Sequence, residues 1–158
     1  MNVIFDCDNT FGVSGCDVDD GLALLYLLGS KEVNLLGITS TYGNSDIETV
    51  GNSTNKMLKE IGRTELPLLK GGSQAGETRS EAVDFLVDTV NGHAGDISIL
   101  ATGSLTNLYG AYQKDADFFD KVDRLCLMGG LTETLLINGK VLDELNFSCD
   151  PEATYHVL

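Results

Sequence analysis

The amino-acid sequence predicts an α/β fold, an open and mostly parallel sheet with helices on both of its faces. Two observations lead to this prediction. Short apolar runs typical of buried strands alternate with segments that have helical spacing, which is the pattern of βαβ crossovers. Polar and acidic residues also gather directly after several apolar runs, where open α/β sheets bind ligands.

The first half of the chain contains three predicted strands and three predicted helices. Apolar positions at Val50, Met57, Leu58 and Ile61 share one helical face, and Gly62 stands where a helix would stop. The run of leucines before residue 29 predicts a mostly buried helix. We therefore expect strands at 2–5, 33–40 and 66–69, and helices at 22–28, 46–61 and 81–90.

The second half continues the pattern and then changes it. We expect strands at 97–102 and 124–128, separated by a helix that the segment 103–107 opens and that runs through Ala111. The Asn138-Gly139 pair inside 135–142 predicts a small β-hairpin. Asp150-Pro151 announces a last helix, which has barely two turns before Leu158. We therefore expect residues 1–158 to form a single domain, truncated at its C-terminus relative to its fold.

Composition and charge narrow the function classes. The 158 residues are 42% hydrophobic with a mean hydropathy near zero, which is ordinary for a globular protein. Neither a run of about 20 apolar residues nor an N-terminal signal pattern is present, so we expect a cytoplasmic protein without a membrane partner. A net charge of −14, from 24 acidic and 10 basic residues, argues against nucleic acid and anionic membranes as partners.

Cysteine and histidine usage does not indicate a zinc site. The four cysteines have no Cys-x-x-Cys spacing, and the chain contains only two histidines. We expect reduced and mainly buried thiols, with a redox link between Cys7 and Cys16 left open because they are close in sequence.

Five aspartates follow the first strand within a stretch that contains no Lys or Arg. They are Asp6, Asp8, Asp17, Asp19 and Asp20. Like charges this close raise one another's pKa unless a cation compensates, and carboxylate oxygens select calcium or magnesium. The spacing does not match an EF-hand loop. A simpler alternative is that Asp17, Asp19 and Asp20 only cap or start the following helix.

Five sequence blocks together resemble the inosine-uridine preferring nucleoside hydrolase family. The family's Asp-x-Asp-Pro-Gly-x-Asp-Asp signature is matched by Asp6-Cys7-Asp8 and Asp19-Asp20, although the loop between them is longer and Asn9 stands in place of proline. The chain has about half of the family's usual length. A further metal-binding aspartate and a neighbouring histidine of the family's C-terminal half have no match here. The other blocks are 41–44, 102–107, 127–130, and 144–146 with 150–153.

The resemblance implies a Rossmann-like core and a calcium-dependent nucleoside hydrolase. Asp8, Asp20 and the backbone carbonyl of Thr102 would hold Ca²⁺. Asp8 would be the catalytic general base that activates a calcium-bound water for attack on C1′ of a ribonucleoside. The products would be the free base and ribose, as in purine or pyrimidine salvage. The N-glycosidic bond would break through an oxocarbenium-like sugar.

The same resemblance assigns ribose-binding residues and partners. Asp6 would orient the loop through hydrogen bonds without holding the metal. The expected partner is a small-molecule nucleoside, and the family usually forms homo-oligomers. The family's ribose-holding positions are Asp19, Asn44, Met128, Glu144 and Asn146. On the sequence alone Asn44 also fits a turn, Met128 fits a core position, and Glu144 and Asn146 fit a solvated segment.

Two alternatives remain at this point. The chain could be a truncated, non-catalytic family member that keeps some affinity for metal and sugar. It could also be a haloacid-dehalogenase-like phosphatase, with Asp6 as nucleophile, Asp8 as acid/base and magnesium as cofactor. The phosphatase hypothesis leaves Asp19-Asp20 unexplained, and its later acidic block is not found, because Gly95-Asp96 precedes a strand instead of following one.

Overall fold

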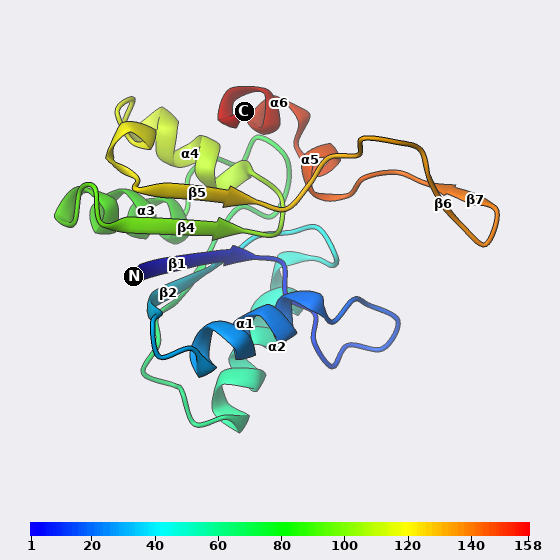
Figure 1. The fold of residues 1–158 in the computed structure, drawn as a ribbon, viewed down its shortest axis with the longest axis horizontal. Helices are drawn as coiled ribbons and strands as arrows, with labels where there is room; N and C mark the ends of the chain where they lie inside the picture. Colours follow the sequence, from blue (N-terminus) through cyan, green and yellow to red (C-terminus); the bar gives the residue numbers. More distant parts are fainter.

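The computed structural model describes residues 1–158, apart from the side chain of Ile137. Its centre is a five-stranded sheet in which all neighbouring strands are parallel. The order across the sheet is β3-β2-β1-β4-β5, so β1 lies in the middle (Figure 1). The strands are β1 (Asn2–Cys7), β2 (Asn34–Ser40), β3 (Leu68–Lys70), β4 (Ile97–Ala101) and β5 (Arg124–Leu127). The predicted α/β fold class is confirmed.

A helix connects each strand to the next parallel strand. α1 (Asp19–Gly29) and α2 (Ile47–Glu60) lie on one face of the sheet, and α3 (Glu81–Gly92) and α4 (Thr106–Lys114) lie on the other (Figure 1). The first connections build outward from β1 to β3, and the later ones build outward from β4 to β5. The direction of winding therefore reverses between β1 and β4, and open sheets of this kind bind ligands outside the carboxyl ends of such strands.

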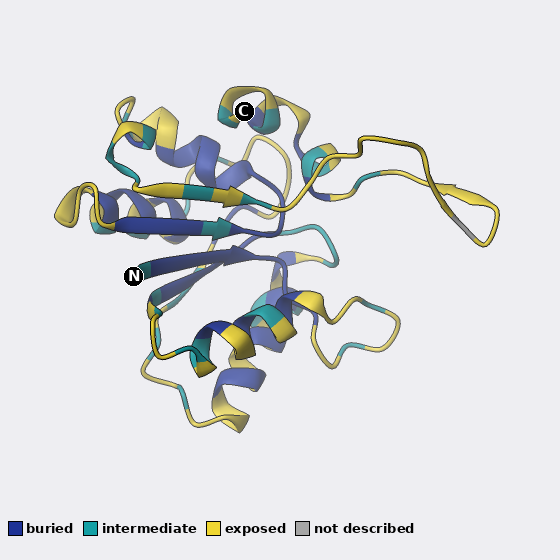
Figure 2. Ribbon diagram, in the orientation of Figure 1, coloured by how far each residue is buried: buried dark blue, intermediate teal, exposed yellow. Residues whose placement is uncertain are grey.

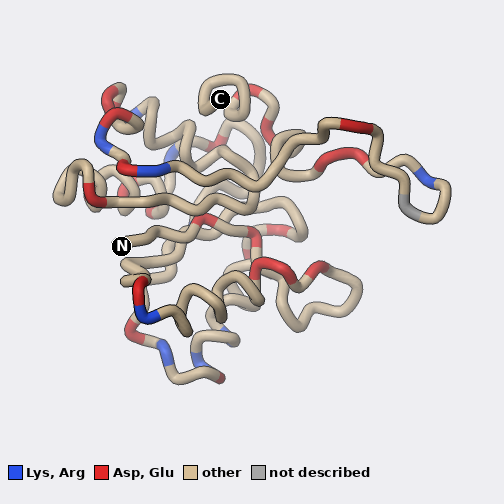
Figure 3. Tube along the Cα trace, in the orientation of Figure 1, with Lys and Arg blue, Asp and Glu red and all other residues tan. Residues whose placement is uncertain are grey.

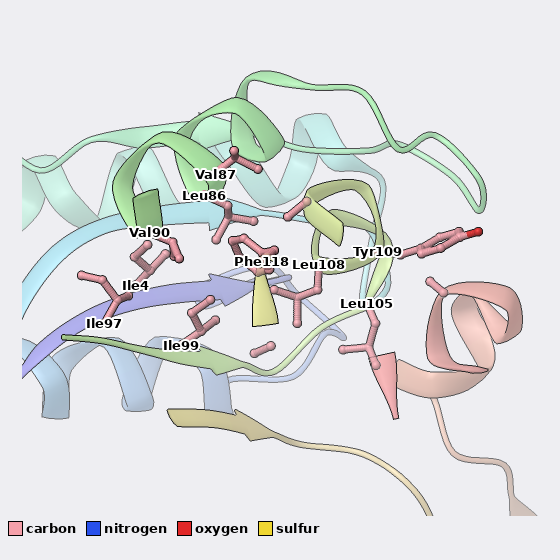
Figure 4. Packing of buried hydrophobic residues seen from close by; sticks show 13 residues of the cluster. Ile4, Leu86, Val87, Val90, Ile97, Ile99, Leu105, Leu108, Tyr109 and Phe118 are labelled. Carbon is pink, nitrogen blue, oxygen red and sulfur yellow. The ribbon is translucent and has the colours of Figure 1, made fainter. Parts of the chain in front are cut away.

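The core has two layers, one on each face of the sheet, because successive side chains of β1 point to opposite faces. Val3 and Phe5 pack with Leu24 of α1 and Met57 of α2. Ile4 packs on the other side against residues of α3, α4 and β4, as Figure 4 shows. In Figure 2 the central strands are buried along most of their length, so the sheet is a rigid base for the loops at its edge.

Two details of the predicted helices were wrong. α1 is not mostly buried, since Leu22 is 54% exposed and Tyr26 is 77% exposed. Ile61 is 37% exposed and lies just after the last residue of α2. A helix that covers one face of a sheet buries a single stripe, which in α1 contains Leu24 and Leu27, so leucines around the rest of its circumference remain in solvent.

The segment after β5 forms the predicted hairpin and two short helices. β6 (Leu135–Ile137) and β7 (Lys140–Leu142) pair antiparallel, and the positive φ angles of Asn138 and Gly139 form the tight turn between them. The hairpin projects away from the sheet in Figure 1. α5 (Asn146–Cys149) and α6 (Pro151–Val157) follow, with a 3₁₀ turn, η1 (Phe119–Lys121), earlier in the chain. Asp150 caps α6 as predicted, accepting a hydrogen bond from Ala153 N.

Within the described residues, none of the helices is long and apolar enough to cross a membrane. The four cysteines are free thiols, which includes the pair Cys7 and Cys16. Only Cys7 is buried, and Cys126 on the edge strand β5 is exposed, so the expectation of mainly buried thiols was wrong. Successive side chains of a strand point to opposite faces of the sheet, and those of Arg124 and Cys126 lie on a face of β5 that is open to solvent.

Candidate active site

A cleft of about 390 Å³ lies beyond the carboxyl ends of β4 and β5. It is bounded by the loop before α1, the loop after β2 and the segment that carries the hairpin. Of the nine positions predicted from the sequence to be site or loop-orienting residues, six line this cleft, although they come from five separate parts of the chain. These six are Asp19, Asn44, Thr102, Met128, Glu144 and Asn146.

Asp8 and Asp20 form a buried pair beside the cleft. The backbone N–H of Asp8 donates a 3.0 Å hydrogen bond to Oδ2 of Asp20. Asn44 joins the pair to the cleft, since its backbone N–H donates to Oδ2 of Asp8 at 2.6 Å and its side-chain amide donates to Oδ1 at 3.3 Å. Asn44 is therefore more than a turn residue. A Cβ at position 43 would overlap Asp8 Oδ2, so Gly43 allows this close approach.

The electrostatics of the pair favour a bound cation. Burial raises the pKa of Asp20 to about 8, and the adjacent Asp8 carboxylate adds to this rise, while a contact with Thr102 lowers it. Burial also raises the pKa of Asp8, an effect that the hydrogen bond from Asn44 partly offsets. The salt bridges in the described part of the chain all lie elsewhere. Two buried carboxylates without a compensating Lys or Arg are a suitable partial ligand set for a hard divalent cation.

The fit to calcium is partial in the described residues. They contain no group of three or more His, Cys, Asp or Glu side chains arranged around a common metal position. Asp8, Asp20 and the carbonyl of Thr102 would supply oxygen ligands only, which is the donor type that calcium selects over softer metals. Figure 3 shows the acidic residues near the start of α1 and along both arms of the hairpin segment.

Asp6 lies below this pair and does not reach the cleft, since it is completely buried at the end of β1. Its Oδ1 accepts hydrogen bonds from Thr39 Oγ1 at 2.5 Å and from Asn107 Nδ2 at 2.8 Å, whereas Oδ2 has no partner in the described chain. Burial raises the pKa of Asp6 to about 7. These contacts suit the orienting role and argue against the phosphatase hypothesis, because a nucleophile must be reachable by its substrate.

Asn146 connects the loops that follow β4 and β5. Its Nδ2 donates to the backbone carbonyl of Thr102 at 2.9 Å and to that of Met128 at 3.0 Å. Asn146 is buried rather than solvated, and Met128 is 49% exposed rather than in the core. The structure therefore excludes a core position for Met128 and a solvated position for Asn146, the two alternatives that the sequence left open.

Glu144 and Asp19 both line the cleft, but only the Glu144 carboxylate is held by hydrogen bonds to a helix. The Glu144 carboxylate accepts backbone hydrogen bonds from Phe147 at 2.8 Å and from Ser148 at 3.1 Å, so it caps the first turn of α5. Asp19 is the first residue of α1, where it faces the cleft and also complements the helix dipole. Asp17 does not cap α1, because the N-cap residue of this helix is Val18 and no side chain forms a capping hydrogen bond there.

The long loop between the two acidic blocks is anchored at its start. Asn9, at the position of the expected proline, is buried and donates to Thr54 Oγ1 of α2 at 3.2 Å. Asn9 Oδ1 also accepts from Phe11 N at 2.9 Å, and Ser53 Oγ donates to the Phe11 carbonyl at 2.8 Å. The loop thus replaces proline's stiffness with side-chain hydrogen bonds.

Two supporting residues had no assigned role in the sequence. Asn107 contacts three segments, since its amide nitrogen donates to Asp6 and to the Ser40 carbonyl, and its oxygen accepts from Gly72 N. Thr39, at the end of β2, is the second donor to Asp6. Asn107 closes one of the sequence blocks that carried the resemblance, and this position was the signal available in the sequence.

Comparison with known proteins agrees with this geometry. The family model described as inosine-uridine preferring nucleoside hydrolase matches residues 3–158. The chain belongs to this family. A uridine nucleosidase described as probable, from Oryza sativa subsp. japonica, is 28% identical over 165 residues, which cover 86% of this chain and 49% of that protein. An inosine-uridine preferring nucleoside hydrolase from Leishmania major is 27% identical and covers 98% of this chain and 56% of its own length.

Solved structures show the same fold. A purine-preferring ribonucleoside hydrolase from Gardnerella vaginalis superposes with a TM-score of 0.82 at 29% identity, over 97% of this chain and 56% of that one. The chain thus spans about half the length of the family members that it matches. The matched part contains Asp6, Asp8, Asp19 and Asp20 and the cleft described above.

Proposed function

We propose that this chain provides the water-activating and ribose-binding part of a nucleoside hydrolase that cleaves the N-glycosidic bond of a ribonucleoside to free base and ribose. The observation that carries the proposal is the buried Asp8–Asp20 pair, connected through Asn44 to a cleft that contains the five predicted ribose-binding residues. The family match over residues 3–158 supports the reaction class.

Asp8, Asp20 and the Thr102 carbonyl would hold a calcium ion. When bound, calcium would neutralise the two carboxylates, lower the pKa of a coordinated water and leave sites for ribose hydroxyls. The hydrogen bond from Asn146 to the Thr102 carbonyl does not prevent this, because a carbonyl oxygen has two lone pairs.

Asp8 is the group that would remove a proton from the attacking water. Its Oδ2 is occupied by a short bond from Asn44 N, whereas Oδ1 has only the longer 3.3 Å contact. Oδ1 is therefore the oxygen better able to accept the proton. Asn44 keeps the carboxylate oriented while this happens, as a general base needs a fixed direction toward its water.

The cleft suits the charge that develops on the sugar. An oxocarbenium-like ribosyl group carries positive charge, and the acidic side chains around the cleft would stabilise it more than the neutral nucleoside. Asn146 and Met128 fix the wall formed by the loops after β4 and β5. Neither histidine lines the cleft, since His156 stacks on Tyr109 and His93 contacts the Thr89 carbonyl, so we assign neither a role in protonating the leaving base.

The remaining expectations about partners are also proposals. A small, uncharged nucleoside is compatible with a chain of net charge −14, which would repel nucleic acid. Homo-oligomerisation follows only from the resemblance, and light scattering of the purified chain at several concentrations would test it directly.

The test is release of free ribose from inosine and uridine by the purified chain, with calcium and with a chelator. We expect calcium-dependent release that falls by about 10²-fold or more in Asp8→Asn. Asp88→Asn is the matched control, because Asp88 is exposed on α3 and does not line the cleft. Calcium-dependent stabilisation without any ribose release would instead identify a metal-binding chain that does not turn over.

A further inference from the structure

Asp17 brings a carboxylate into the cleft from the long loop before α1. It lines the cleft together with Asn44, Met128 and Asn146. The resemblance of this loop to the family signature uses Asp6, Asp8, Asp19 and Asp20 and does not include Asp17. Asp17 therefore adds a charge to the cleft that the signature does not account for.

The position of Asp17 is fixed through its backbone. Its carbonyl accepts a 3.0 Å hydrogen bond from the hydroxyl of Thr10, which is itself buried. The intervening residues close turns, with Val13 N donating to the Thr10 carbonyl at 2.9 Å and Cys16 N donating to that of Val13 at 3.3 Å. Cys16 Sγ also contacts the Asn44 carbonyl at 3.9 Å. The loop is thus tied back to its own start at Thr10 and attached to the loop after β2 at Asn44.

The Asp17 carboxylate is free to bind a ligand. Within the described residues, no group donates a hydrogen bond to it, whereas the Glu144 carboxylate of the same cleft accepts hydrogen bonds from the backbone of α5. The cleft lining contains Asp17, Asp19, Asp143 and Glu144 but no Lys or Arg. In a cleft of about 390 Å³, each of these charges lies within about one Debye length of a bound molecule.

A second polar group in the same cleft also lacks a partner. The hydroxyl of Thr102 is buried and forms no hydrogen bond within the described chain, and Thr102 lines the cleft. Buried hydroxyls are normally satisfied, and this one lies near Asp20, whose pKa it lowers, so it can bond either to that carboxylate or to a ligand in the cleft. The cleft therefore offers a bound molecule polar groups of both Asp17 and Thr102.

We propose that Asp17 is a specificity-determining residue, which accepts a hydrogen bond from an N–H or O–H group of the bound nucleoside and repels the same nucleoside when it carries a phosphate. This inference rests on the proposed function. A carboxylate in the cleft strengthens the binding of a hydrogen-bond donor, because a charged hydrogen bond is stronger than a neutral one. It weakens the binding of an anion, because like charges in a small cleft repel.

The test compares the affinities of uridine and uridine 5′-monophosphate by titration calorimetry, in calcium at low salt. We expect the wild type to bind uridine at least tenfold more tightly than the monophosphate. Asp17→Asn should weaken uridine binding severalfold and reduce that ratio about fivefold or more. Asp17→Glu should keep the ratio within twofold of the wild type, and Asp88→Asn should leave both affinities unchanged.

The salt dependence separates electrostatic repulsion from a change in shape. Raising the salt concentration should reduce the ratio of the uridine affinity to the monophosphate affinity in the wild type, and should change that ratio much less in Asp17→Asn. An Asp17→Asn chain whose two affinities match those of Asp88→Asn would overturn this inference while leaving the proposed function intact. Failure of the wild type to bind uridine would overturn both. Asp17 is exposed, so its substitution should leave the unfolding temperature unchanged.

Discussion

The backbone N–H of Asp8, just after β1, donates a 3.0 Å hydrogen bond to Oδ2 of Asp20 in the first turn of α1. Asp8 and Asp20 are twelve positions apart in the sequence but are in direct contact in the structure. The long loop between them projects outward and leaves the two acidic blocks in contact. The lengthened loop therefore preserves the pair of carboxylates and adds Asp17 to the cleft wall.

Stability of the calcium-free chain should fall as the pH rises. Burial raises the pKa of Asp6 to about 7 and that of Asp20 to about 8, against about 3.9 for an unfolded aspartate. Between these values the folded chain binds more protons than the unfolded chain, so the free energy of unfolding decreases with pH. We expect the unfolding temperature in chelator to be about 5 °C or more lower at pH 8 than at pH 5. A flat profile across this range would contradict the raised pKa values.

Calcium should reverse this loss through Asp20. At pH 8 excess calcium should raise the unfolding temperature of the wild type, because a ligand that binds only the folded state stabilises it. Asp20→Asn should be more stable than the wild type in chelator, since one buried charge is removed, and should respond little to calcium. Differential scanning fluorimetry measures both effects. An Asp20→Asn chain that responds to calcium like the control Asp88→Asn would exclude Asp20 as a ligand.

Gly43→Ala should displace the Asp8 carboxylate without removing any of the proposed site side chains. An added Cβ would overlap Asp8 Oδ2, so either the carboxylate or the Asn44 hydrogen bonds must shift. We expect a loss of about 2 kcal/mol in the free energy of unfolding together with weaker calcium binding. Gly51→Ala in α2 is the matched control, because its Cβ meets no atom within 4 Å and alanine favours a helix, so it should stabilise the chain. Equal effects of the two substitutions in urea titrations would refute the close approach.

Asn107→Ala should be among the most damaging substitutions outside the cleft. It removes two N–H donors and one acceptor, so Asp6 keeps only its hydrogen bond from Thr39, and the Ser40 carbonyl and the Gly72 N–H each lose their bond to Asn107. We expect a loss of about 3 kcal/mol or more in urea unfolding. Asn55→Ala on the exposed side of α2 should change stability by less than about 0.5 kcal/mol. A loss in Asn107→Ala no larger than in the control would mean that these hydrogen bonds are not formed in solution.

Local sequence determined most of the elements. A short, mostly apolar run such as 97–101 predicts a buried strand. Helix starts such as Asp46 and Asp150 are specified by side chains that accept a hydrogen bond from the backbone N–H three residues ahead. The Asn138-Gly139 turn likewise depends only on residues that tolerate positive φ. The limit of such local patterns is visible in α1, where a run of leucines did not reveal which of them face the sheet.

The sequence by itself determined the fold class and the chemical character of the site, because strand and helix periodicity and the acidic blocks are properties of neighbouring residues. Only the tertiary structure decided which side chains the site uses and how. It placed Met128 at a cleft wall, joined Asn146 to the Thr102 carbonyl, put Asn107 beneath Asp6 and brought Asp17 into the cleft. The physical reason is that these roles depend on contacts between segments far apart in the chain, and a residue's local pattern does not specify its distant partners.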